Sequence, residues 1–356
     1  MKLLKTIPMI LFIAINLLVI MAMIFCAYTC MLPPQTYPNW SYFGMAFPVF
    51  AVLDIIFIVF WLIFKWKVAA LPLLGLLVCA GAARTYFPVN IQREVPGGCI
   101  KVLSYNVMSF GKEAAQPFED NAIVKYIIDS KADIVCIQEG TRSGYDYILS
   151  LWEKDYPYQS VQDSVYNFMF LLSKYPILKS ERIMYESASN YSYAHTLLVG
   201  KDTLYVINNH FESYKLKDED RENYKTMVKH PRNDSTEVIY SDLTTKIASA
   251  NAIRGAQADS VGAYIDRLRG KHIIACGDFN DPSISYTHYR MTRYLDDAYT
   301  CSGNGPGISY NKSGMWFRID NILMSPEMES YKAKVDNKIS VSDHYPISCY
   351  LKICEK

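Results

Sequence analysis

Apolar residues are unevenly distributed along this chain, and roughly the first ninety positions are almost free of charge. An uncharged run covers residues 7–31, which is about the length that a helix needs to cross a bilayer. Further apolar runs cover residues 43–64, interrupted by Asp54, and residues 68–83. The pattern predicts three transmembrane helices. A cleaved signal peptide begins similarly, but its apolar core is shorter and no further runs follow it.

The basic residues indicate how these helices are oriented. Loop 32–41 carries no charge, whereas four lysines flank the other helix ends: Lys2, Lys5, Lys65 and Lys67. Because Lys and Arg favour the cytoplasmic side, three crossings place the remainder of the chain outside the cytoplasm. Arg84 and Arg93 argue weakly for the opposite orientation. Asp54 is either a functional group within the membrane or a protonated acid bonded to a neighbouring helix, for example through Asn16.

From residue 99 onwards, short apolar runs alternate with segments of helical period. The predicted division is therefore a membrane region at 1–88, a linker at 89–98 and a soluble domain at 99–356. Strands are expected at 99–105, 133–138, 167–172, 194–199, 203–208, 273–276, 318–324 and 345–353. Helices are expected at 117–129, 149–158 and 242–268. Segment 211–244 is charged and has no clean period, so it is either a solvated insertion or a segment that overhangs a site.

Polar side chains follow many of the predicted strands. In a layered α/β domain such strand ends gather at one edge, so these residues are expected to converge. At the best-defined end, Asp278 and Asn280 face the same way on an extended backbone. They either hold a hydrated metal and a phosphoryl oxygen or form an Asx turn that closes the strand. The residues at strand ends are Asn106, Glu139, His210, Asp278, Asn280, Asp320, Asp343 and His344.

Composition restricts the function only slightly. The chain has 356 residues and a formal net charge of +1, and it lacks a basic ridge interleaved with aromatic residues that would grip a nucleic-acid strand. Nine cysteines are present without CxxC pairs or zinc-ligand spacing, so no disulfide framework is predicted.

Several short motifs occur in a characteristic order: an NV dipeptide after the first strand, then IVCIQE, NNHFES, GDFND, RIDNIL and SDHYPI. In this order and spacing they resemble the endonuclease/exonuclease/phosphatase superfamily, which includes pancreatic-type deoxyribonucleases and neutral sphingomyelinases. The resemblance covers roughly residues 99–354, and GDFN together with SDHYPI is its most specific part. It implies a four-layered α/β sandwich in which two mainly antiparallel sheets pack together, and a Mg²⁺ or Mn²⁺ site.

The resemblance also implies roles for the residues at the strand ends. Glu139 would be the main metal ligand, with Asn106 and Asp343 completing the metal shell. His344, oriented by Asp320, would act as general base or as donor to the phosphate. Three further residues complete the implied machinery: His210 as donor to the phosphate or leaving oxygen, Asp278 as the group that orients water, and Asn280 as the group that holds a phosphoryl oxygen.

Two positions are weaker candidates. Arg142 follows Glu139 closely and either contacts a substrate phosphate or is a surface arginine. Asn167 precedes a predicted strand at a position that is often polar in the superfamily.

These observations predict a membrane-anchored, metal-dependent phosphoester hydrolase, with phosphodiesters favoured over phosphomonoesters. Its substrate would be a lipid headgroup, a nucleic acid outside the cytoplasm or a small phosphoester. The alternative is an inactive membrane-tethered scaffold that binds a partner through segment 211–244. A receptor or transport role is disfavoured, because the three predicted spans contain a single isolated carboxyl group.

Overall fold

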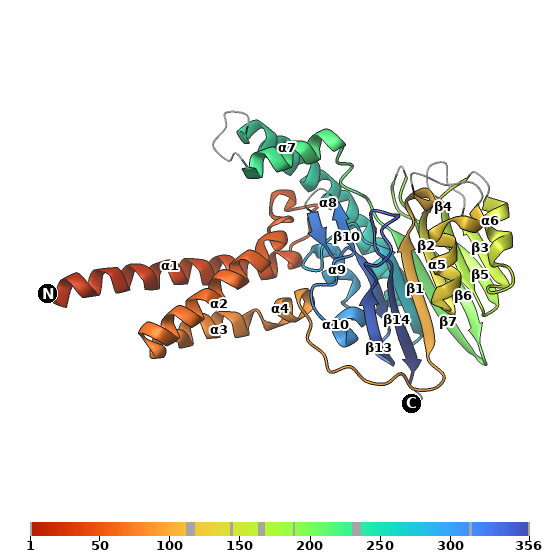
Figure 1. Cartoon of the computed structure of the whole chain (residues 1–356), viewed down its shortest axis with the longest axis horizontal. Coiled ribbons are helices and arrows are strands. Elements are labelled where there is room, and N and C mark those ends of the chain that lie inside the picture. Colours follow the sequence, from red (N-terminus) through yellow and green to blue (C-terminus); the bar gives the residue numbers. More distant parts are fainter. Residues whose placement is uncertain are drawn as a thin grey trace.

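The chain folds into a bundle of apolar helices that projects from an α/β body (Figure 1). The computed structural model describes residues 2–111, 118–142, 145–162, 168–187, 189–229, 236–312 and 315–354. The bundle contains α1 (Lys2–Tyr28), α2 (Phe47–Phe64), α3 (Ala70–Val78) and α4 (Ala80–Tyr86). Short 3-10 turns connect these helices: η1 (Thr29–Met31), η2 (Pro38–Trp40), η3 (Phe43–Ala46) and η4 (Trp66–Ala69).

Two six-stranded sheets form the body. The first sheet has the strand order β13 (Met328–Val335), β14 (Ile347–Ile353), β1 (Ile100–Asn106), β2 (Ile134–Gly140), β4 (Phe168–Ser173) and β3 (Tyr158–Gln162). The second has the order β5 (Ile177–Ile183), β6 (Ser192–Val199), β7 (Asp202–His210), β8 (His272–Asp278), β12 (Asp320–Met324) and β9 (Asp296–Asp297). At the centre of each sheet the described strands form one parallel pair, β1 with β2 and β7 with β8, and their other pairings are antiparallel. The predicted sandwich of mainly antiparallel sheets is therefore confirmed.

The sheets face each other across one apolar layer and are covered by helices on their outer faces. Val102 and Ile134 of the first sheet meet Val206 and Ile274 of the second in the shared core. Because side chains alternate along a strand, Leu103 points the other way, into the core beneath the outer helices. Both faces of the central strands are buried, which explains their continuous apolar runs.

Helices cover the outer face of each sheet, as expected for a four-layered arrangement. The first sheet carries α5 (Ala122–Ser130) and α6 (Tyr145–Trp152), and α5 begins where Asn121 accepts hydrogen bonds from the backbone of Ile123 and Val124. The second sheet carries α8 (Thr236–Arg267) and α9 (Tyr286–Met291). Other elements are η5 (Met108–Phe110), η6 (Phe118–Asp120), α10 (Ala298–Ser302) and a small hairpin of β10 (Tyr310–Lys312) and β11 (Met315–Phe317).

Segment 211–244 is more regular than the sequence suggested, because it contains α7 (Asp218–Lys229) and the start of α8. Helix α7 consists mainly of charged and polar residues, so its few apolar positions gave too weak a signal to predict it. The acidic residues in the first turn of α7 stabilise it, because their negative charge interacts favourably with the positive end of the helix dipole. Asp218 also pairs with Arg221 at 3.1 Å, and Asp220 pairs with Lys246 of α8 at 2.7 Å.

The prediction of three continuous spans is wrong for the third helix. Two helical segments, Met9–Met31 and Pro38–Phe64, are long and apolar enough to cross a membrane. The third apolar run is a pair of helical segments, Trp66–Val78 and Ala80–Tyr86, bent by 65° at a break, and it counts as a span only if the bent pair is taken as one. Hydropathy measures apolar length and is insensitive to a bend, and this run contains Gly75 and Gly81, which weaken a helix.

The helix bundle is packed against the α/β body. Ile284 of the body lies in an apolar cluster with Met23, Phe47 and Cys79 of the bundle. Segment 89–98 has neither helix nor strand, and its Asn90 donates hydrogen bonds to the backbone oxygens of Thr300 and Gly303. Inside the bundle, Asp54 and Asn16 are buried, and Asn16 Oδ1 accepts a hydrogen bond from Trp61 at 3.0 Å.

Candidate active site

The residues predicted at strand ends meet at one edge of the sandwich because the two parallel pairs run in the same direction. Asn106 and His210 end β1 and β7, and Asp278 ends β8 in register with His210. Strand β12 runs antiparallel to β8, so its first residue, Asp320, pairs with Asp278. Carboxylates, amides and imidazoles from both sheets are therefore brought together across the core.

Asp278 lies at the centre of this group and is almost fully buried. Its Oδ2 accepts a hydrogen bond from Asn106 Nδ2 at 3.0 Å, which links the two sheets. The same oxygen lies 3.7 Å from His210 Nε2 and 3.6 Å from His344 Nε2. Burial raises the pKa of the Asp278 carboxyl group and the nearby Asp320 raises it further, whereas the two histidines and Asn106 lower it.

His344 and Asp320 form a buried pair in which the imidazole Nδ1 lies 2.8 Å from the Asp320 Oδ2. This contact orients the ring so that Nε2 faces Asp278. Burial alone would lower the pKa of His344, but Asp320 and Asp278 raise it to about 10. The ring of Tyr310 packs against the imidazole, with the two ring centroids 5.1 Å apart.

Glu139 enters the site through an irregularity in β2. Its φ is +52°, and the register between β2 and β4 shifts between Ile137 and Gly140. Such a bulge re-aims a side chain, and here the Glu139 Oε1 accepts a hydrogen bond from Asn106 Nδ2 at 3.0 Å and lies 3.5 Å from His210 Nε2. Gly140 is required beside it, because a Cβ there would overlap the Phe170 ring.

The loop after β8 shows that the two interpretations of Asp278 and Asn280 are compatible. Asn280 has a φ of +51°, and its backbone N–H donates to Asp278 Oδ1 at 2.8 Å, which is the Asx turn. This leaves Asp278 Oδ2 directed at the histidines. The Asn280 side chain donates to the backbone oxygen of Phe211 at 2.9 Å and so ties this loop to the residue after His210.

The arrangement fits a divalent cation. Two groups of ligand atoms within the described residues lie close enough to share an ion: Glu139 with His210 and Asp278, and Asp278 with Asp320 and His344. The Glu139 and Asp278 carboxylates both accept a hydrogen bond from Asn106 Nδ2, each at 3.0 Å. Their oxygens therefore converge on one positively polarised group, as they would on a cation. Carboxylate oxygens with a histidine at the edge suit a hard ion such as Mg²⁺ or Mn²⁺.

Not every predicted residue belongs to these groups. Asp343 lies outside both, and its Oδ2 is 3.5 Å from Lys312 Nζ. Arg142 is exposed, and Asn167 falls outside the described residues.

The sequence did not point to several residues that support the site. Ser342 donates to the backbone oxygen of Asn106 at 2.8 Å and accepts from the backbone N–H of His344 at 3.1 Å, so it joins two chain segments of the site. Arg221 of α7 donates to the Tyr310 hydroxyl at 3.3 Å, which links segment 211–244 to the ring beside His344. Tyr310 is one of 28 tyrosines in the chain, so it did not stand out in the sequence. Ser342 carries no chemical signal of its own there either.

A small cavity of about 220 Å³ opens beside this group of residues. Glu139 and His210 line it together with Asn190 and three serines, Ser109, Ser189 and Ser213. The lining is predominantly polar, which suits a small charged group such as a phosphate ester.

A model of the Endonuclease/Exonuclease/phosphatase family matches residues 103–344. The chain belongs to this family. Among the residues that this match covers are Asn106, Glu139, His210, Asp278 and His344. A model described as a domain of unknown function (DUF8431) matches residues 9–86, which cover the helix bundle except for the start of α1. No curated protein matches the chain.

Solved structures support the same fold at low sequence identity. Truncated Caenorhabditis elegans TDP2 has a TM-score of 0.52 and 16% identity, and the alignment covers 73% of this chain and 99% of that chain. The human Nocturnin catalytic domain with bound sulfate anion has a TM-score of 0.53 and 15% identity, with coverages of 74% and 96%. D. rerio TDP2 complexed with a single-strand DNA product has a TM-score of 0.50 and 16% identity, with coverages of 72% and 99%. The family fold accounts for the α/β body and leaves the helix bundle as an addition to it.

Proposed function

We propose that this member of the family is a membrane-anchored, divalent-metal-dependent phosphoester hydrolase that prefers phosphodiesters to phosphomonoesters. The observation that carries the proposal is the position of Asp278, whose Oδ2 lies within 3.7 Å of groups from His210, His344 and Asn106. Such a convergence of a buried carboxylate with two imidazoles is costly for folding alone, and it suits proton transfer around a phosphorus centre.

In this proposal the residues divide the work between binding and proton transfer. Asp278 orients the attacking water, whose oxygen forms the new bond to phosphorus and whose proton passes to the Asp278 carboxylate, because the raised pKa of His344 keeps that imidazole protonated as a donor to the phosphate. Asp320 fixes the His344 ring, so that Nε2 is the nitrogen available on the side of the substrate. His210 donates to the phosphate or to the leaving oxygen as its bond to phosphorus breaks, and Asn280 holds a phosphoryl oxygen.

Glu139 would be the main ligand of the ion, with Asn106 and Asp343 completing or supporting the metal shell beside Asp278. A bound Mg²⁺ or Mn²⁺ would supply stabilisation of the negative charge that grows on the phosphoryl oxygens. Arg142 is retained as an additional contact for a substrate phosphate. The three serines and Asn190 of the polar cavity add hydroxyl and amide groups for the remaining oxygens.

The proposed substrate is one of three kinds of phosphoester: a lipid headgroup, a nucleic acid or a small phosphoester. Two structural neighbours support an anionic ligand at this fold, since one holds a sulfate anion and one a single-strand DNA product.

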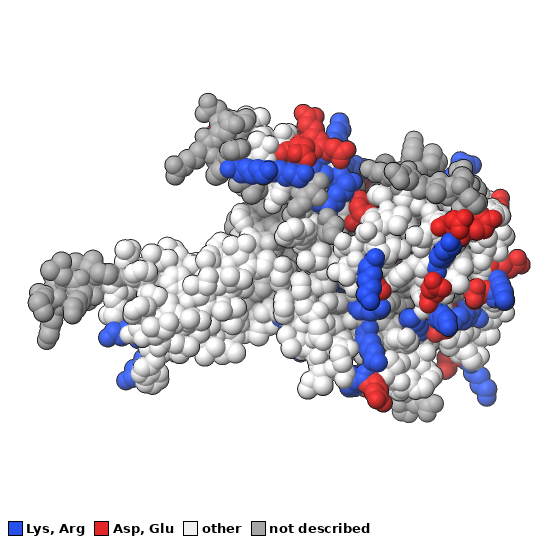
Figure 2. All heavy atoms as spheres, viewed as in Figure 1, with Lys and Arg blue, Asp and Glu red and all other residues white. Residues whose placement is uncertain are grey.

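The proposed anchor is the helix bundle, with the bilayer as partner and the catalytic domain outside the cytoplasm. Figure 2 shows the bundle as almost uncharged, with Lys or Arg at the tip farthest from the body. In Figure 1 the N-terminus and the turn between α2 and α3 lie at that tip, and the body lies at the opposite end. Lys65 and Lys67 occupy this turn and are exposed. This arrangement supports the orientation predicted from the lysines, with α3 and α4 together as the third crossing.

The deciding experiment uses the full chain in detergent with bis(p-nitrophenyl) phosphate as a phosphodiester and p-nitrophenyl phosphate as a monoester. We expect hydrolysis of the diester with Mg²⁺ or Mn²⁺, its loss on chelation with EDTA, and slower hydrolysis of the monoester. Glu139→Gln and His344→Gln should each lower kcat by about a hundredfold or more. Glu153→Gln, at an exposed position on the surface, is the matched control and should retain activity. Equal rates in all variants would refute the hydrolase and favour an inactive scaffold.

A further inference from the structure

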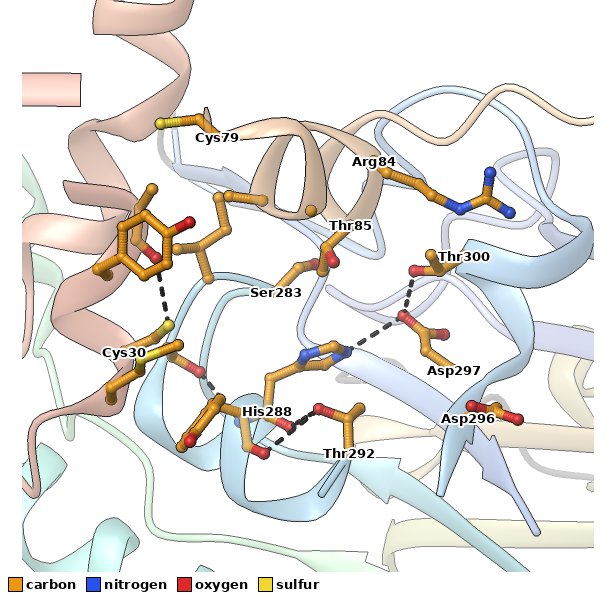
Figure 3. Close-up of a pocket in the computed structure, with 18 of the residues that line it drawn as sticks. Cys30, Cys79, Arg84, Thr85, Ser283, His288, Thr292, Asp296, Asp297 and Thr300 are labelled. Carbon is orange, nitrogen blue, oxygen red and sulfur yellow. Dashed lines mark hydrogen bonds and ion pairs between the residues drawn. The ribbon is translucent and has the colours of Figure 1, made fainter. Parts of the chain in front are cut away.

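A second cavity, of about 470 Å³, lies where the helix bundle meets the α/β body (Figure 3). Its walls come from the last turn of α1 with η1, from α4 and from the region around α9 and α10. Its volume lies within the range of about 300–1,000 Å³ that is usual for sites of small molecules. None of its lining residues belongs to the group around Asp278.

The cavity lies at the depth where the bundle would leave the bilayer. Exposed aromatic residues mark both ends of the bundle: Trp66 at the tip, and Tyr28, Tyr37 and Trp40 on the side of the body. Trp and Tyr favour the membrane–water interfaces, so these two levels bound the proposed hydrocarbon region. Tyr28 itself lines the cavity, which therefore opens at the level of the lipid headgroups next to the catalytic domain.

One part of the wall is apolar and continues the surface of the bundle. Ala27 and Met31 contribute from α1 and η1, Ala82 from α4, and Ile284 from the body. Outside the cavity, α1 and α3 expose further apolar side chains such as Met21 and Leu74, which would contact acyl chains. A lipid that covers these faces can extend into the cavity without leaving its apolar surroundings.

Another part of the wall is polar and carries two carboxylates, the exposed Asp296 and the buried Asp297, of which Asp297 is engaged by neighbouring groups. Asp297 Oδ2 accepts from Thr300 at 2.7 Å and lies 2.8 Å from Arg318 Nη2 and 3.1 Å from His288 Nε2. Burial would raise the pKa of Asp297, but Arg318 and His288 hold it well below its usual value. The charge of Asp297 is therefore compensated within the body.

Arg84 is the cation on this side of the cavity, where it lies near Thr300 in Figure 3. It is exposed, and its Nη2 reaches Asn90 Oδ1 at 3.4 Å, which is a long contact for a hydrogen bond. A guanidinium presents a planar fork that matches two phosphate oxygens at once.

We propose that this cavity binds one phospholipid of the surrounding bilayer, with the upper part of its acyl chains against α1 and α4 and its phosphate at Arg84. Free inorganic phosphate would leave the apolar wall uncovered, and a lipid without phosphate would leave Arg84 without an anionic partner. This lipid site shares no residue with the candidate active site, and binding of the lipid does not require that the protein hydrolyse a phosphoester.

The bound lipid would also contact the catalytic loop. Ser283, Ile284 and Ser285 line the cavity and follow Asn280 closely in the chain. A lipid in the cavity would therefore pack against the segment that carries Asp278 and Asn280, and it would stabilise the docking of the bundle on the body.

The test uses the full chain reconstituted in nanodiscs that contain dioleoyl phosphatidylethanolamine and dioleoylglycerol, followed by native mass spectrometry. We expect one retained phosphatidylethanolamine and no retained dioleoylglycerol. Ala82→Trp, which fills the cavity, should abolish retention, and Arg84→Gln should lower it about tenfold, as expected for the loss of one charge-assisted contact. Leu77→Trp, on the exposed lipid-facing side of α3, is the matched control and should retain the lipid.

The melting temperature of each variant in detergent shows whether the chain has folded. Retention of the phospholipid by a folded Ala82→Trp variant would overturn the site. Equal retention of dioleoylglycerol, or full retention by Arg84→Gln, would overturn the phosphate contact. Each result is read from bound lipid, so it stands whether or not the catalytic site hydrolyses a phosphoester.

Discussion

Gly44 in the membrane region packs directly against the backbone carbonyl of Ile284 in the α/β body, so closely that a Cβ at position 44 would overlap the carbonyl oxygen. Ile284 follows Asn280 by four residues and inserts its side chain among Met23 and Phe47 of the bundle. The helices therefore do more than tether the domain, because they form part of the support for the loop after β8.

This contact predicts that Gly44→Ala destabilises the full chain. The added methyl group must displace backbone rather than a flexible side chain, which typically costs about 1–3 kcal/mol. The melting temperature in detergent should fall, and limited proteolysis should cleave the junction faster. Gly97→Ala is the control, because a Cβ at position 97 meets no atom within 4 Å. If both variants have the same melting temperature, the close packing of η3 on Ile284 does not stabilise the chain.

The His344–Asp320 pair predicts a specific catalytic defect. Asp320→Asn keeps the shape of the side chain but removes the charge that holds the imidazole Nδ1 at 2.8 Å. Since the ring would lose its fixed orientation, we expect kcat for a phosphodiester to fall by about a hundredfold or more while KM changes little. Circular dichroism should show a retained fold. Asp266→Asn, which touches only the exposed pair with Arg269, should leave kcat unaltered.

The sequence predicted well where the strands that carry the candidate site end, and it predicted poorly which residues surround those ends. Asn106, His210 and Asp278 end strands that are buried on both faces, so each is preceded by an apolar run and its position follows from the pattern. Tyr310 belongs to a strand of three residues, which is too short to produce any period. Its contact with His344 depends on tertiary packing alone.

Two further elements show why regular structure was missed. Strand β13 lies at the edge of its sheet and exposes Glu329 and Lys332 to solvent, so its charge resembles that of a loop. Helix α7 consists mainly of charged and polar residues, so it resembles a solvated loop as well. In the membrane region hydropathy gave the lengths of the apolar runs correctly, but it contains no information about the bend of 65° near Cys79.

A buried ion pair behind the site predicts a large loss of stability. Arg254 is fully buried, and its Nε lies 3.3 Å from the Asp281 Oδ2 while its Nη1 donates to the backbone oxygen of Glu212 at 2.5 Å. It thus joins the loop after His210 to the loop after Asn280.

Asp281→Ala would leave the Arg254 charge buried without its main partner, which typically costs about 3–5 kcal/mol. Thermal unfolding of the full chain measures this loss. Asp266→Ala removes an acidic partner from an exposed pair and should cost less than about 1 kcal/mol, so it is the matched control. A similar small cost for both variants would mean that the Arg254–Asp281 pair contributes little to joining the two loops.

His195 predicts how stability depends on pH away from the site. The side chain is almost fully buried on β6, with Nδ1 at 2.8 Å from the Ser180 hydroxyl, and burial lowers its pKa from 6.5 to about 3. Below pH 6.5 the unfolded chain therefore binds a proton at this residue that the folded chain does not bind. The contribution of His195 to the free energy of unfolding decreases as the pH falls through this window, by about 1.4 kcal/mol per pH unit, and is independent of pH above it.

The histidine of the unfolded chain becomes protonated between about pH 7 and pH 5. We therefore expect the melting temperature of His195→Gln to decrease less over this pH range than that of the wild type. Leu198→Gln on the same strand changes a half-exposed residue without a titrating group, and it should keep the slope of the wild type. Because His195 pairs with Val206, four residues before His210 on β7, and belongs to neither group of metal ligand atoms, the effect should be the same with Mg²⁺ and with EDTA. An unaltered slope in His195→Gln would show that this histidine is protonated in the folded chain, contrary to its buried, neutral assignment.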